Sequence, residues 1–183
     1  MALSKFHHWV KKHRTKLSGI LGVSFLIFAK PTTASLFMGA SLIMVGEALR
    51  IWSSGYIHKN QNLSVTGPYS LTRNPLYVGS FLLGTGFVIT TNVLWLIFLY
   101  LLFFGGIYWF TIRWEEEKLK GIFPGEWEEY IQGVPRFFPL LRIPRYRKGT
   151  FHWSQVFRNK ELLNASVVVV VYAILWGKAL LMG

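Results

Sequence analysis

Long apolar runs alternate with short polar, basic segments along the whole chain. Five runs carry few charged residues: 17–29, 34–57, 75–90, 93–112 and 162–181. A helix needs about 20 mostly apolar residues to cross a bilayer, so the longer runs predict membrane helices. The first run is short and follows basic residues, a pattern that also resembles a signal peptide cleaved after Ala34. Because Lys30-Pro31 interrupts the small-residue cleavage pattern, we favour a short membrane helix and predict an all-α integral membrane protein with about five transmembrane helices.

Composition agrees with this class. Of the 183 residues, 52% are hydrophobic and 17% aromatic, yet the formal net charge is +12. We expect the basic face to meet anionic lipid headgroups, and we predict no nucleic-acid partner. The chain has no cysteine, which excludes disulfides and thiolate ligands. His7, His8 and His13 lack the i,i+4 spacing and carboxylate support of a metal site, so we predict no metal.

The distribution of positive charge predicts an orientation. With the N-terminus in the cytoplasm, segments 1–16, 58–74 and 113–161 face the cytoplasm and hold 17 of the 20 Lys and Arg residues. We therefore predict a single domain, 1–183, with a basic interfacial segment at 1–16 and a last transmembrane helix at 162–181. A further basic patch is expected at Arg142, Arg145, Arg147 and Lys148.

The first polar motif runs from 67 to 79 and reads Gly-Pro-Tyr-Ser-Leu-Thr-Arg-Asn-Pro-Leu-Tyr-Val-Gly. Gly67-Pro68 and Asn74-Pro75 are turn dipeptides, and proline is well placed in the first turn of a helix. The motif therefore delivers Arg73 and Asn74 to the start of a helix that begins at Pro75. A helix N-terminus beside an arginine favours anion binding.

The second polar motif, 113–136, contains six of the eight acidic residues, and all eight are glutamate. Its strong helix formers predict that the fourth membrane helix continues past the membrane, followed by an amphipathic helix over 125–132. Three consecutive glutamates, Glu115 to Glu117, cannot all face one way on a helix. One or two of them are expected to point toward the first motif, because both motifs lie on the predicted cytoplasmic side.

Together the motifs favour a zwitterionic ligand. Arg73 suits a carboxylate, and Glu116 or Glu117 suits an ammonium group. Nearby aromatic residues suit a flat ring or a sulfonium. S-adenosylmethionine has all of these groups, but on the residues alone it is one candidate among several zwitterions.

Glu47 and Arg50 are charged residues within the second apolar run. Their i,i+3 spacing places them on one helix face, where they can pair. Charges at this depth usually face a bundle interior or a polar cavity. The pair is therefore either a structural contact between helices or part of an active-site lining.

The order and spacing of the two motifs resemble those of the isoprenylcysteine carboxyl methyltransferase family and the related phospholipid N-methyltransferases. The resemblance covers about 45–140, which we take as the catalytic region. It implies a small multi-span enzyme that binds S-adenosylmethionine on the cytoplasmic side and takes a lipophilic acceptor from the bilayer. The cofactor pocket it implies comprises Tyr69, Arg73, Asn74, Pro75, Tyr77 and Gly79, with Glu116 and Glu117 opposite. The best-known members carry His where this chain has Asn74, and a neutral amide cannot serve as a titrating base.

Methyl transfer is an in-line displacement that needs positioning more than proton chemistry. Arg50 or Arg136 is a candidate to hold an acidic acceptor, and Glu117 or Glu47 is a candidate base for an amine. Two alternatives remain: a membrane sterol-type reductase that uses NADPH, and a basic membrane protein that binds lipid without catalysis. The short N-terminal part argues against the reductase, and simple lipid binding leaves Glu47, Arg50 and the glutamate cluster without a task.

Overall fold

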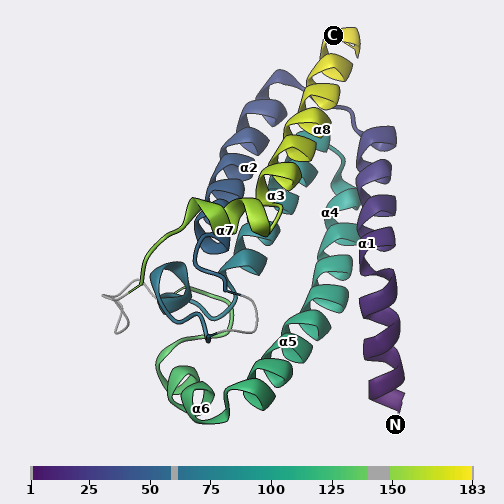
Figure 1. Ribbon diagram of the computed structural model, residues 1–183. Coiled ribbons are helices and arrows are strands. Elements are labelled where there is room, and N and C mark those ends of the chain that lie inside the picture. Colours follow the sequence, from purple (N-terminus) through teal and green to yellow (C-terminus); the bar gives the residue numbers. More distant parts are fainter. Residues whose placement is uncertain (1, 59–61, 140–148, 183) are drawn as a thin grey trace.

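The structure, a computed structural model, describes residues 2–58, 62–139 and 149–182, and in the first helix it excludes the side chains of 2–12, 14 and 15. The described residues are mostly helical, which confirms the predicted all-α fold (Figure 1). The longer elements are α1 (Ala2–Phe28), α2 (Thr33–Ser54), α3 (Pro75–Thr91), α4 (Leu94–Phe103), α5 (Trp109–Ile122) and α8 (Glu161–Met182). The shorter ones are η1 (Gly67–Ser70), η2 (Phe104–Tyr108), α6 (Pro124–Gly133) and α7 (Trp153–Arg158).

Three helices are long and apolar enough to cross a membrane: Thr33–Ser54, Leu94–Ile122 and Glu161–Met182. Two shorter apolar helices, Lys16–Phe28 and Pro75–Thr91, accompany them, so the crossing of all five stays a prediction. The helix bounds differ from the predicted ones in two places. The basic segment 1–16 was set apart from the first apolar run, but from Ala2 onward both belong to α1, and α2 ends at Ser54 rather than at 57. The predicted basic patch at 142–148 lies outside the described residues.

Helices α2 and α3 pack with their backbones in close approach. A Cβ atom added at Gly46 would lie 2.7 Å from the carbonyl oxygen of Gly79, and one added at Gly86 would lie 2.7 Å from that of Gly39. Only glycine leaves this space, which explains the small residues along both helices. The Gly84-Thr-Gly86 stretch was expected to serve helix packing, and Gly86 does so.

Helices α4, η2 and α5 form one continuous helix over Leu94–Ile122, as the motif predicted (Figure 1). Its middle section, η2, is a π-helix, an element that often marks a functional site. After Phe123 the chain turns into α6, close to the predicted amphipathic helix. Lys120, near the end of α5, pairs with Glu128 of α6 at 2.9 Å.

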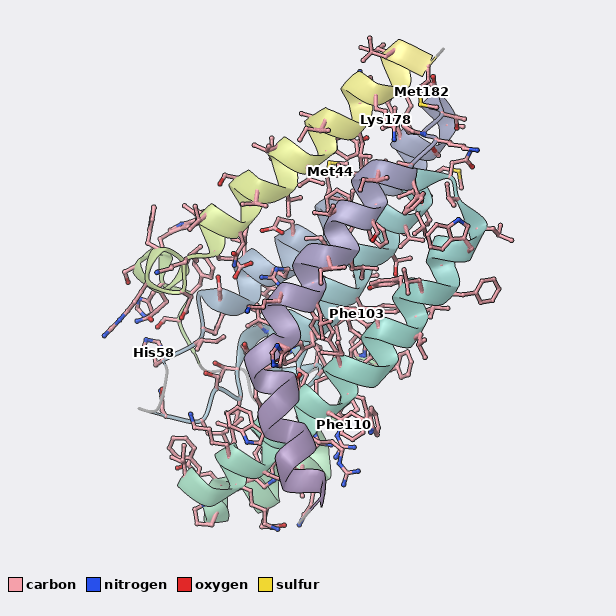
Figure 2. All side chains as sticks on the ribbon, turned by 90° about the vertical axis from the view of Figure 1, so that its right-hand side faces the viewer. Met44, His58, Phe103, Phe110, Lys178 and Met182 are labelled. Atoms are coloured by element: carbon pink, nitrogen blue, oxygen red, sulfur yellow. The ribbon has the colours of Figure 1, made fainter. Side chains whose placement is uncertain are left out.

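The last helix, α8, contacts the end of α1 through a residue near its own C-terminal end. The Nζ of Lys178 donates to the carbonyl oxygens of Leu26 and Ile27, at 2.9 and 2.8 Å. These carbonyls are at the C-terminal end of α1, where a helix favours a cation. Figure 2 shows Lys178 in the upper part of α8, far from His58. His58 lies at the opposite end, near α7, where the polar connections gather.

Candidate functional site

The first motif is held in place by local backbone chemistry. Gly67 has φ +58°, a left-handed conformation that glycine adopts readily, and a Cβ there would meet the ring of Tyr56. The η1 turn follows, and the carbonyl of Tyr69 accepts a hydrogen bond of 2.6 Å from the Tyr130 hydroxyl of α6. Pro75 is the first residue of α3, as predicted. The turn therefore presents residues 69–74 toward the second motif.

A single buried carboxylate, that of Glu116, joins the two motifs. It accepts a hydrogen bond from Asn74 Nδ2 at 3.0 Å and another from Arg136 Nε at 2.9 Å. It also pairs with Arg73 Nη1 at 3.5 Å. The predicted meeting of the two motifs is thus confirmed, and Asn74 contributes as a neutral donor rather than a base.

Neutral hydrogen bonds support the same junction. The hydroxyl of Thr72 lies 2.9 Å from the carbonyl oxygen of Phe137 and 3.2 Å from that of Arg136. The backbone N–H of Arg73 donates to the carbonyl of Pro135 at 2.8 Å. Because Thr72 is almost fully buried, these contacts are shielded from water.

Beside this junction lies a cavity of about 720 Å³, within the size range of small-molecule sites. Motif residues on its wall are Tyr69, Arg73, Asn74, Tyr77, Glu115 and Tyr130. Membrane helices add Ser18 of α1, Arg50 of α2, Ser80 of α3 and Asn164 of α8. The cavity therefore extends from the motifs to the polar positions of the membrane helices, and we call these two regions the motif end and the inner end.

Arg73 gives the motif end a cation with spare hydrogen-bonding capacity. Its side chain is 13% exposed, and its Nε has no hydrogen-bond partner among the described residues. The guanidinium also lies 5.8 Å from the centre of the Trp127 ring. Burial lowers the pKa of Arg73 from its usual value, and the nearby Glu116 partly opposes this shift. An anionic ligand group would satisfy the spare donor.

A tyrosine and a carboxylate face the cavity beside Arg73. The Tyr77 hydroxyl donates to Glu115 Oε1 at 2.7 Å. Tyr77 also contacts the ring of Tyr108, with ring centres 5.6 Å apart. Burial raises the pKa of Tyr69 well above its usual value, and the neighbouring Tyr130 adds to this shift, so this phenol stays neutral. Aromatic rings around a carboxylate suit a cationic ligand group.

At the inner end, every guanidinium nitrogen of Arg50 has a protein partner. Nε and Nη2 lie 2.8 and 2.6 Å from Oε1 of Glu161, and Nη1 donates to the Ser80 hydroxyl. The predicted pairing of Glu47 with Arg50 is present as a longer ion pair, 3.9 Å from Oε2 to Nε, and neither oxygen of Glu47 has a hydrogen-bond partner among the described residues. Arg50 therefore fits both earlier interpretations, a contact between helices and a cavity lining.

The predicted site residues fall into two groups. Five of them line the cavity: Arg50, Tyr69, Arg73, Asn74 and Tyr77. The others are not on its wall: Pro75 and Gly79 are buried in α3, Glu116 and Arg136 pair with each other, and Glu117 is exposed. Their roles in catalysis or cofactor binding stay predictions.

Sequence reasoning missed several cavity residues. Glu115 lies on the cavity wall, whereas the predicted residues Glu116 and Glu117 do not. Asn164 and the arginine partner Glu161 lie in the first turns of α8. One feature of the sequence could have pointed to Glu161. It is the only acidic residue apart from Glu47 and the six within 115–129, and it stands at the start of an apolar span.

The fold and site define an all-helical membrane protein with a polar, aromatic-lined cavity between two motifs. The chain belongs to the phospholipid methyltransferase family, whose model matches residues 20–126. This membership supports a membrane methyltransferase, in agreement with the resemblance seen in the motifs.

Two curated relatives carry names from metal resistance. The cobalt-zinc-cadmium resistance protein CzcN of Cupriavidus metallidurans is 39% identical over 139 residues, which cover 72% of this chain and 62% of the relative. The nickel-cobalt-cadmium resistance protein NccN of Alcaligenes xylosoxydans xylosoxydans is 36% identical over 110 residues, covering 59% of this chain and 50% of the relative. The chain thus spans between half and two thirds of their length. No solved structure matches significantly.

Proposed function

We propose that this protein is a membrane methyltransferase that uses S-adenosylmethionine and transfers a methyl group to a lipophilic acceptor. The observation that carries the proposal is the motif end of the cavity, which is lined by the guanidinium of Arg73 and by the carboxylate of Glu115, hydrogen-bonded to Tyr77. A carboxylate and an ammonium or sulfonium on one molecule match these two features. The family match adds independent support.

Arg73 and Glu115 are the residues that would hold the cofactor. Arg73 would bind its carboxylate through its guanidinium group, and the N-terminus of α3 adds a favourable dipole. Glu115, held by Tyr77, would bind the positive groups, a task that the sequence had given to Glu116 or Glu117. Glu116 instead fixes the position of Arg73. The bound cofactor supplies an electrophilic methyl group.

The remaining residues position the acceptor and exclude water. The inner end offers Ser18, Ser80 and Asn164 as hydrogen-bonding groups, and apolar residues such as Leu76 and Ile107 also line the cavity. A lipophilic molecule with a polar head fits such a wall. Positioning and desolvation are the main contributions needed for an in-line displacement.

The test is to determine which cofactor the protein retains. Full-length protein purified in detergent is incubated with labelled S-adenosylmethionine or labelled NADPH and then passed through a desalting column. We expect retention of S-adenosylmethionine. Retention of NADPH alone would replace this proposal with the sterol-type reductase, and retention of neither would favour a lipid-binding protein without catalysis.

We place the motif end on the cytoplasmic side because the basic segments gather there. Reporter fusions after Asn62 and after Pro139 should both give a cytoplasmic signal. A signal from the opposite side at either position would reverse the orientation. The names of the two relatives suggest metal tolerance as the physiological setting, and growth of a deletion strain with added cobalt, zinc or cadmium tests that suggestion.

A further inference from the structure

We infer that Glu161 determines the charge preference of the inner end of the cavity: by occupying Arg50, it makes this end favour a neutral or cationic acceptor group over an anionic one. The inference rests on the proposed function only in treating the bound molecule as a methyl acceptor. The charge preference is a property of the cavity itself. It assigns a specificity role to a residue outside the segment, 20–126, that the family model matches.

The first support is the position of Glu161. It is the first residue of α8, 4% exposed, in a helical turn that favours an acid. Two features of the α7–α8 connection hold it there. The Asn159 side chain donates to the carbonyl of Ser54 at 3.0 Å, and Lys160 adopts a φ of +59°. The start of α8 is therefore fixed against the end of α2, and Glu161 reaches Arg50.

The second support is the pairing of Arg50. Glu161 contacts two of its three guanidinium nitrogens, and Ser80 accepts from the third. An acceptor anion that binds the Nε–Nη2 edge of this guanidinium would have to displace Glu161, which would then be a buried carboxylate without its partner. That displacement is costly inside a protein. Arg50 therefore lines the cavity with its charge already compensated.

The third support is the count of charges around Arg50. One guanidinium faces two carboxylates, Glu161 and Glu47, so the cluster carries a formal excess of one negative charge. The other polar residues at the inner end, Ser18, Ser80 and Asn164, are uncharged. The remaining charged or titratable groups on the cavity wall belong to the motifs and connections: His58, Tyr69, Arg73, Tyr77, Tyr108, Glu115, Lys118 and Tyr130. At short range the local excess repels an anion and attracts a cation.

The experiment compares two single-chain amphiphiles that differ only in head charge, dodecylamine and dodecanoate. Their equilibrium binding to the full-length protein is measured at neutral pH in an uncharged detergent. The readout is the ratio of the two dissociation constants, because partition into the micelle acts equally on wild type and variant. The inference is tested on the change of this ratio from wild type to variant, in which the different micelle partition of the two amphiphiles cancels.

Variants then assign the preference to Glu161. Glu161→Gln removes one negative charge and should lower the preference for the amine by about tenfold or more. Glu161→Asp keeps the charge and should retain the preference, even if it changes overall affinity. Glu128→Gln is the matched control, because Glu128 is exposed and pairs with Lys120 on the surface. An unchanged ratio in folded Glu161→Gln would show that the pair only joins α2 to α8.

Retention of labelled S-adenosylmethionine is measured on the same samples. Because Glu161 does not line the motif end, Glu161→Gln should retain the cofactor as wild type does. If no sample retains it, the proposed function fails, while the amphiphile ratios still decide the charge preference.

Discussion

Two arginines line the same cavity in opposite surroundings. Arg73 shares one carboxylate, Glu116, with Arg136, so two cations face one anion. Arg50 faces two carboxylates, and all its nitrogens have partners, whereas the Nε of Arg73 has none among the described residues. An arginine in a cavity therefore does not by itself make an anion site. The number of carboxylates around the arginine decides whether it can bind an anionic group of a ligand.

The largest expected effect comes from removing the carboxylate that holds the motif end. Glu116→Ala would leave Arg73 and Arg136 as neighbouring cations and would remove one of the two acceptors of the Asn74 amide. We expect a loss of about 3–5 kcal/mol in the free energy of unfolding, the range for breaking a buried ion pair from one side. Denaturant unfolding in detergent measures it, and Glu117→Ala is the control because Glu117 is exposed. Equal stability of the two variants would contradict the role of Glu116.

The second prediction tests the motif end as a cofactor site. Arg73→Ala and Glu115→Ala should each weaken binding of S-adenosylmethionine by about 1.5–3 kcal/mol, the value of a hydrogen bond to a charged group. Calorimetry on the purified protein gives the affinities. Glu117→Ala should bind as wild type does, and a loss in this variant instead of Glu115→Ala would restore the role predicted for Glu117.

A smaller effect is expected from the neutral contacts at the same junction. Thr72→Val keeps the shape of the side chain but removes the hydroxyl that reaches the carbonyls of 135–137. The expected loss of stability is about 1 kcal/mol, typical of one hydrogen bond. Thermal unfolding measures the loss. A loss as large as that of Glu116→Ala would mean that neutral contacts, rather than the charges, hold the motifs together.

The smallest effect is expected at Glu47. Its oxygens have no hydrogen-bond partner among the described residues, and its distance to Arg50 is 3.9 Å. Glu47→Gln should therefore change the free energy of unfolding by no more than about 0.5 kcal/mol, because a distant ion pair contributes little. Measuring the free energy of unfolding of this variant and of Glu161→Gln compares the two carboxylates as partners of Arg50. A greater loss in Glu47→Gln would make Glu47, and not Glu161, the main partner of Arg50.

The sequence predicted the helices and the meeting of the two motifs, because apolar run length and charge asymmetry are local signals. It did not predict which glutamate faces the cavity. Successive residues turn by about 100° on a helix, and a π-helix precedes α5, so the facing residue depends on packing. It also did not predict the partner of Arg50. Glu161 is 111 positions away, and only the turn between α7 and α8 brings it there. Contacts of this kind depend on tertiary structure.

The glycine contacts between α2 and α3 have a mechanical consequence. With no side chain at Gly46 or Gly79, the two backbones interlock, and neither helix can slide or rotate without a steric clash. The two helices therefore form one rigid unit, with Arg50 on α2 and Ser80 on α3. Under the proposed function, a lipophilic acceptor from the bilayer would enter past α1, the long α4–α5 helix or α8, because the close contacts of Gly46 and Gly79 close the seam between α2 and α3.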